Sequence, residues 1–127
     1  VPSATAVPTA TQAPTVTLLP TPSATPLAGG GRLAFITNRF GQKDLFTIRP
    51  NGTELNRLTQ STADEWEPSW SPDGTRLAYV YKDLFHPIEE GVFIVNSDGS
   101  AGRRISYQGW GPSWSPDGRC PAWWSGN

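Results

Sequence analysis

Few side chains in this sequence could carry chemistry, and its single histidine and single cysteine come first. His86 lies in the segment 83–87, Asp-Leu-Phe-His-Pro, and a general base or zinc ligand there would need oriented partners. Cys120 has Arg119 as its only nearby basic residue, whereas a nucleophilic thiol needs an activating base. We therefore expect a solvated loop histidine and a buried or inert thiol.

Other catalytic and ligand-binding patterns are missing from the sequence. It contains no Gly-x-Ser-x-Gly nucleophile elbow, no Gly-x-Gly-x-x-Gly motif and no P-loop. Asp73-Gly74 and Asp98-Gly99-Ser100 resemble fragments of calcium loops, but the ligand spacing of an EF-hand is absent. Turn formation explains these aspartates better. We predict no catalytic residue, no metal site and no cofactor, and hence no enzyme.

The composition excludes several classes of partner. The formal net charge is −1, with 10 basic and 11 acidic residues, so the long-range attraction that nucleic acids and anionic membranes require is missing. No apolar run is long enough to insert into a membrane. One cysteine excludes a disulfide framework within this chain. Protein, peptide or glycan partners remain.

The chain divides into two parts of very different composition. Residues 1–28 contain six prolines, seven threonines and no charge, and every charged or aromatic residue lies from Arg32 onward. The prolines would interrupt any helix or central strand, and scattered Val and Leu bury too little apolar surface to order the tract. We predict that residues 1–31 form a disordered Pro/Thr/Ala-rich linker and that residues 32–127 fold.

The second part repeats itself. Residues 68–74, Pro-Ser-Trp-Ser-Pro-Asp-Gly, recur without a change at 112–118, at an offset of 44. The same offset relates Leu33-Ala34-Phe35 to Leu77-Ala78-Tyr79, while 45–48 map onto 92–95 at an offset of 47. Self-similarity at this period signals a repeat architecture.

Each unit contains short strand-like runs between turn formers. Residues 75–81 and 91–95 are rich in β-branched and aromatic side chains, which favours strands. Ser71-Pro72-Asp73-Gly74 is a tight turn by composition, and Pro50-Asn51-Gly52 and Ser97-Asp98-Gly99 are typical of hairpin turns. Four strands in about 44 residues is the size of a β-propeller blade.

These motifs, in this order, resemble the WD-like repeat of TolB-type β-propellers. The resemblance covers about residues 32–124 and rests on Pro-Ser-Trp-Ser-Pro-Asp-Gly, the following Arg-Leu-Ala-Tyr, and later Asn-Ser-Asp-Gly-Ser and Arg-Arg-Ile-Ser. It implies an all-β fragment of a propeller built of four-stranded antiparallel blades. The repeat motif consists of Trp70, Pro72, Asp73, Gly74, Trp114, Pro116, Asp117 and Gly118.

The blade plan of that family implies nine strands. In the order a to d they cover 66–71, 75–81, 91–95 and 102–106, preceded by b, c and d at 32–37, 44–49 and 55–60, and followed by a and b at 110–115 and 119–124. One complete blade between two partial ones cannot close a ring of four to eight blades. We expect further blades from missing sequence or from other chains.

The tryptophans divide into two repeated pairs. Trp70 and Trp114 suit packing between neighbouring blades, because aromatic side chains bury the most area. Trp66 and Trp110 lie where a loop meets a strand, and either blade packing or an exposed contact fits them.

In a four-stranded meander the b–c and d–a loops emerge on one face. Aromatic residues among mixed charges there suit a surface that recognises protein, peptide or glycan, although an ordinary solvated face is the alternative. The candidate partner-binding residues are Arg39, Phe40, Glu65, Trp66, Lys82, Phe85, His86 and Trp110.

Three functions fit these expectations. The first is a non-enzymatic, extracytoplasmic (periplasmic or cell-surface) binding module, tethered through the N-terminal linker. The alternatives are the sensor region of a membrane-anchored receptor kinase and the non-catalytic propeller domain of a serine peptidase. We favour the first because it assumes least.

Overall fold

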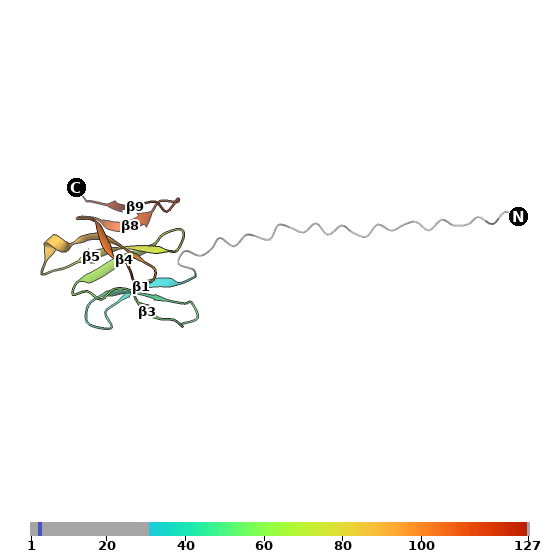
Figure 1. Cartoon of the computed structure of the whole chain (residues 1–127), viewed down its shortest axis with the longest axis horizontal. Helices are drawn as coiled ribbons and strands as arrows, with labels where there is room; N and C mark the ends of the chain where they lie inside the picture. The colour runs from blue at the N-terminus through green and yellow to red at the C-terminus, as the bar shows by residue number, and fades with distance from the viewer. Residues whose placement is uncertain (1–2, 4–30, 127) are drawn as a thin grey trace.

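The computed structural model describes residue 3 and residues 31–126, and over residues 31–126 the fold is almost entirely β (Figure 1). The first sheet contains β1 (Leu33–Thr37), β2 (Asp44–Ile48) and β3 (Asn56–Arg57). The second contains β4 (Asp64–Trp70), β5 (Arg76–Lys82), β6 (Gly91–Asn96) and β7 (Arg103–Ser106), with a short 3-10 helix, η1 (Pro87–Glu89), before β6. The third contains β8 (Trp110–Trp114) and β9 (Pro121–Trp124).

The predicted all-β blade architecture is confirmed. All nine predicted strands form, every pairing is antiparallel, and the complete four-stranded sheet lies between the two partial ones. Several boundaries differ from the predicted ones, and two of these differences matter most: β4 begins at Asp64, earlier than predicted, and β3 is shorter. Pro121 is accommodated because it is the first residue of β9, where a missing N–H is tolerated.

The repeated motif folds into the same turn twice. The Gly74 N–H donates to the Ser71 carbonyl at 2.9 Å, and the Ser71 hydroxyl and Thr75 N–H both donate to Asp73 Oδ1. These hydrogen bonds, led by that of the Ser71 hydroxyl, lower the pKa of Asp73 to about 2. In the second copy the Gly118 N–H donates to the Ser115 carbonyl, and Asp117 accepts from Ser115 and Arg119.

The core lies between the first and second sheets. Leu45 and Leu58 of the first unit pack with Leu77, Tyr79 and Val95 of the second. Trp70 packs against this cluster, as predicted for a residue between blades. Burial of these side chains therefore holds the sheets face to face.

The second and third sheets meet through the equivalent tryptophan. The Trp114 indole Nε1 donates to the Ser69 carbonyl at 3.0 Å, and the Arg76 guanidinium lies 4.8 Å from the Trp114 ring centroid. Arg76 Nη2 also donates to the Gly118 carbonyl at 2.8 Å, so it joins the two motif turns.

The expected linker, residues 1–31, lies outside the described residues except for Ser3 and Gly31. Within the described part of the chain, no helix is long and apolar enough to cross a membrane.

Candidate functional site

The b–c and d–a loops come together at one edge of the sheets. The Lys43 N–H donates to Asp64 Oδ1 at 2.9 Å, and the Glu65 N–H donates to the Lys43 carbonyl at 2.7 Å. A shallow hollow brings Asp64 together with Lys82 and Phe85. We call this edge the loop face; it is built by residues 41–43, 62–66, 82–90 and 107–110.

Two tryptophans on the loop face each have a lysine ammonium group lying over the ring. Lys43 Nζ lies 3.2 Å from the centroid of the Trp66 ring, and Lys82 Nζ lies 5.1 Å from that of Trp110. The tryptophans remain 37% and 40% exposed, respectively. The two lysines do not occupy equivalent positions in the repeat, yet each covers the tryptophan that begins the next blade. The candidate partner-binding residues selected from the sequence did not include Lys43.

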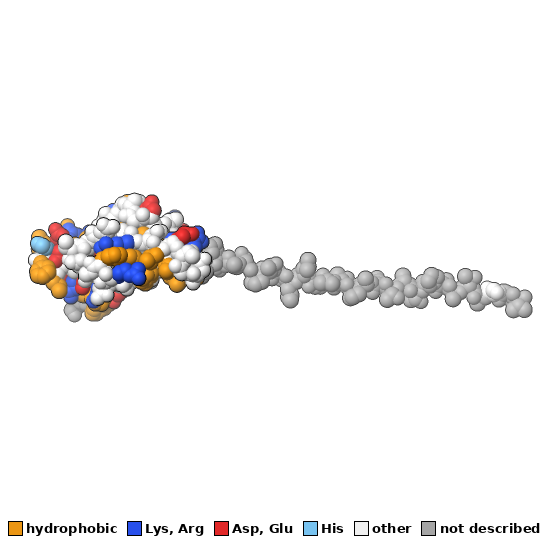
Figure 2. Space-filling view, turned by 90° about the horizontal axis from the view of Figure 1, so that it is seen from below, with side chains coloured by type: hydrophobic (Ala, Val, Ile, Leu, Met, Phe, Trp, Pro, Cys, Tyr) orange, Lys and Arg blue, Asp and Glu red, His pale blue; other side chains and the backbone are white. Residues whose placement is uncertain are grey.

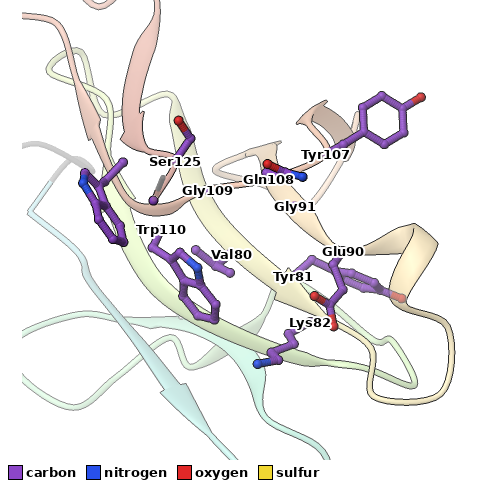
Figure 3. Close-up of a pocket in the computed structure, with 12 residues that line it drawn as sticks. Val80, Tyr81, Lys82, Glu90, Gly91, Tyr107, Gln108, Gly109, Trp110 and Ser125 are labelled. Atoms are coloured by element: carbon purple, nitrogen blue, oxygen red, sulfur yellow. The ribbon is translucent and has the colours of Figure 1, made fainter.

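A cavity of about 220 Å³ opens beside the second pair, between the second and third sheets. Figure 3 shows Lys82, Trp110 and Val80 on one side of it, with Tyr107 pointing away. Its polar lining comes from Lys82, Glu90 and Gln108, and its apolar lining includes Trp110 and Trp124.

The long loop after β5 presents large apolar side chains to solvent. Leu84, Phe85 and Ile88 are 74%, 84% and 83% exposed. Buried Asp83 fixes this loop, because it accepts from the Phe85 and His86 N–H groups, and these bonds, with that of Phe85 foremost, lower its pKa. Figure 2 shows hydrophobic side chains gathered beside the single histidine. Of these residues, only Phe85 and His86 were selected from the sequence. Leu84 and Ile88 could have been selected as large apolar residues in a charged loop.

Arg39 and Phe40 were predicted to lie on the loop face, but the structure places them elsewhere. Phe40 stacks on Phe46 with ring centroids 6.0 Å apart, and the Arg57 guanidinium lies 4.8 Å from the Phe40 ring centroid. Arg39 lines a hollow with Phe35 and Phe46. Both residues therefore lie against the outer face of the first sheet, away from the second sheet.

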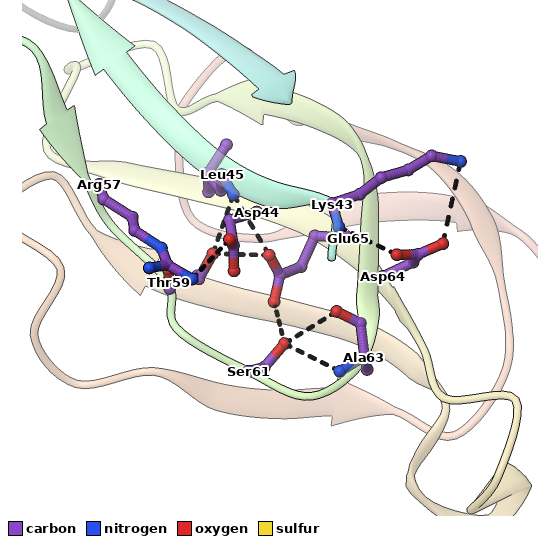
Figure 4. Close-up of polar contacts among 9 residues, drawn as sticks. All are labelled: Lys43, Asp44, Leu45, Arg57, Thr59, Ser61, Ala63, Asp64 and Glu65. Atoms are coloured by element: carbon purple, nitrogen blue, oxygen red, sulfur yellow. Dashed lines mark hydrogen bonds and ion pairs between the residues drawn. The ribbon is translucent and has the colours of Figure 1, made fainter. Parts of the chain in front are cut away.

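Glu65 was predicted to belong to the partner-binding surface, and this prediction is wrong because Glu65 cannot contribute to an exposed surface. Its side chain is completely buried, and it accepts from the Thr59 and Ser61 hydroxyls, each at 2.6 Å, and from the Leu45 N–H at 3.2 Å (Figure 4). Because β4 begins before Glu65, this side chain alternates with that of Trp66 and points inward. Glu65 thus links the second sheet to the first.

Burial raises the pKa of Glu65, and the nearby Asp44 carboxylate adds to this effect, while the bonds from Ser61, Thr59 and Leu45 oppose it. A carboxyl group whose pKa is raised by folding stabilises the fold below its unfolded pKa, and this contribution is lost as the pH rises through the folded value.

We therefore expect Glu65→Gln to gain in stability relative to the parent as the pH rises from 4 to 7.5. Gln keeps the shape of Glu65 and one acceptor oxygen, replaces the other oxygen with an NH2 donor, and does not titrate, so the change of its effect with pH isolates the titration. Urea denaturation of both chains at several pH values measures the difference. A difference that stays constant with pH would contradict a raised pKa.

Among the described residues, no catalytic group of side chains surrounds the histidine or the cysteine. His86 is exposed, and its Nδ1 lies 3.0 Å from Asp83 Oδ2. Cys120 is exposed rather than buried, because it follows the second motif turn at the surface. Among residues 31–126, no three His, Cys, Asp or Glu side chains gather in a way that could hold a metal ion.

Comparisons with known proteins support the repeat assignment. A TolB homologue of Chlorobium luteolum is 38% identical over 77 residues, which cover 61% of this chain and 16% of the relative. The Tol-Pal system protein TolB of Desulfosudis oleivorans is 34% identical over 56 residues, covering 44% of this chain and 13% of the relative. No protein-family model matches the chain.

Solved structures show the same fold. A protein assigned as TolB from Agrobacterium tumefaciens superposes with a TM-score of 0.54 at 27% identity, over 70% of this chain and 36% of that protein. TolB from Acinetobacter baumannii gives 0.52 at 21% identity, over 76% of this chain and 25% of that protein, and this likeness shows the fold alone. The chain thus spans well under half of the relatives that it matches. The predicted resemblance is confirmed: the described residues are similar to part of a TolB-type β-propeller.

Proposed function

We propose that this chain is a non-enzymatic protein-binding module and that its loop face contacts the partner. The observation that carries the proposal is the repeated lysine–tryptophan pair at consecutive blade junctions. Half-exposed tryptophans at the centre of a surface are the residues that most often dominate binding energy. Stacking on Lys43 and Lys82 holds the rings in place before a partner arrives, which lowers the entropy lost on binding.

The chemistry of the loop face favours a protein over a glycan. Leu84, Phe85 and Ile88 project aliphatic and aromatic surface that gains free energy when a partner's apolar side chains cover it. Lys82 and Glu90, which lie beside the cavity, provide a positive and a negative charge for polar contacts around this apolar surface. An extended peptide or a protein surface meets both requirements.

The names of the relatives support a proposal about the location of the chain. Several are named TolB, and one is named a Tol-Pal system protein. We propose an extracytoplasmic chain, with residues 1–31 as a tether and with further blades supplied by missing sequence or by other chains.

Site-specific photo-crosslinking tests this function. A photoreactive phenylalanine analogue replaces Phe85 on the loop face or, as a control, Arg119, whose side chain is 87% exposed at the opposite end of the blades. We expect a distinct protein adduct in living cells from position 85 and none from position 119, identified by mass spectrometry.

Combining the probe at position 85 with Trp110→Ala should reduce the adduct about tenfold, because a central aromatic contact is lost. Trp110 is 40% exposed, so the fold should survive the change. Equal adducts from both ends of the blades, or an adduct indifferent to Trp110, would contradict the proposal.

A further inference from the structure

The two lysine–tryptophan pairs of the loop face differ in charge. At the first pair, Lys43 Nζ lies 3.8 Å from Asp64 Oδ2, and the Lys43 N–H donates to Asp64 Oδ1. At the repeat offset of 44, Asp64 corresponds to Gln108, which is neutral. The second pair, Lys82 with Trp110, therefore lacks the acid that neutralises the first.

The loss of acidic side chains extends along the whole second junction. The first junction reads Asp-Glu-Trp-Glu at 64–67, and the second reads Gln-Gly-Trp-Gly at 108–111. Within the described part of the chain, Lys82 forms no ion pair. Asp64 is its neighbour across the strands, but both carboxylate oxygens of Asp64 face Lys43. The Lys82 ammonium group is thus available to an acid from another molecule.

The cavity beside Trp110 gives such an acid room. Its volume is about 220 Å³, and Lys82, Gln108 and Trp110 all line it (Figure 3). A hollow also lies beside the first pair, but there Asp64 already neutralises Lys43. The half-exposed Trp110 ring offers apolar surface to the methylene groups of an acidic side chain, and partial exclusion of water strengthens the attraction between its carboxylate and the ammonium group.

Glu90 is the acidic residue that lines this cavity, and it restricts the ligand. It forms no ion pair with Lys82 or with any other described residue. At the offset of 47 it corresponds to Lys43, so the second junction has a negative charge where the first has a positive one. Repulsion from Glu90 disfavours a ligand with several carboxylates, so a single acid suits the cavity best.

We propose that the cavity beside Trp110 binds one acidic side chain of the partner protein, aspartate or glutamate, with its carboxylate at Lys82 and its methylene groups against Trp110. This inference rests on the proposed function and names the chemistry that the loop face recognises. Leu84 and Phe85 lie in the hollow that Lys82 also lines, and both are exposed. The partner segment therefore carries its acid next to apolar side chains.

Two substitutions that change the charge of the cavity in opposite directions test the inference. Gln108→Glu adds a carboxylate, Glu90→Gln removes one, and both keep the size of the side chain. With the photoreactive analogue at position 85 of the full chain, we expect Gln108→Glu to reduce the adduct about threefold and Glu90→Gln to increase it about threefold, because one half-exposed ion pair changes affinity by about that factor.

An adduct that ignores both substitutions, or that changes in the reverse directions, would overturn the inference while leaving the protein-binding function in place. Absence of any adduct from position 85 in the parent would instead contradict the proposed function. The charge preference then needs a probe that does not depend on the natural partner.

NMR titration of the full chain with a defined peptide supplies that probe. The peptide is Gly-Leu-Glu-Leu-Gly, blocked at both ends, and the control is the same peptide with glutamine in place of glutamate. We expect the Trp110 indole N–H signal to shift at least about threefold more with the glutamate peptide, and the Trp66 signal to respond equally to both, since Asp64 already neutralises Lys43. Equal shifts of Trp110 with the two peptides would overturn the inference.

Discussion

Replacing Gly91 with alanine is expected to lower the free energy of unfolding by about 4 kcal/mol, the largest loss at any glycine of the blades. Gly91 begins β6 with a φ of +145°, a backbone conformation that L-residues rarely adopt. A Cβ built there would lie 1.9 Å from the Ser106 carbonyl oxygen. That oxygen belongs to the backbone of β7, so β6 and β7 would have to separate.

The matched control is Gly52→Ala. Gly52 also has a positive φ, +83°, but nothing lies within 4 Å of a Cβ built there. Only the conformational cost remains, about 1 kcal/mol. Urea denaturation followed by far-UV circular dichroism measures both losses. Similar losses for the two variants would mean that β7 does not approach Gly91 as closely as the structure shows.

The strand order was predictable because the repeat fixes it twice. A seven-residue motif that recurs at an offset of 44 places two turns, and the apolar runs between them have room only for short strands. The lengths of individual strands were less predictable. β4 extends back to Asp64 because that residue pairs with Lys82, a contact between distant parts of the unit.

The candidate site was predicted only in part, and the reason differs from residue to residue. Trp66 and Trp110 could be selected because aromatics in a loop face stand out, whereas Glu65 required knowing that it lies inside a strand. The stacking of Lys43 on Trp66 joins two units of the repeat, so no pattern within one unit reveals it. Gly91 corresponds to Asp44 in the first unit, so the repeat gave no sign that β7 approaches it.

The second large effect is expected at Trp70. Trp70→Ala should lower the free energy of unfolding by about 3–5 kcal/mol, because the indole packs against the core between the first and second sheets. Trp66→Ala is the matched control: Trp66 lies four residues earlier on the same strand, and more than a third of it is exposed. It should lose about 1 kcal/mol, mainly its contact with Lys43. Equal losses in urea denaturation would remove the distinction between a packing and a contact tryptophan.

Phenylalanine at the same positions separates packing from hydrogen bonding. Trp114→Phe removes a donor that bonds to the Ser69 carbonyl and, beyond the loss of indole volume, should cost about 1 kcal/mol. Trp70 Nε1 is buried without a hydrogen-bond partner among the described residues, so removing this donor relieves its desolvation, and Trp70→Phe should be clearly the milder change. Equal costs for the two phenylalanine variants would contradict this difference and leave the packing role of Trp70 intact, since Trp70→Ala tests the packing alone.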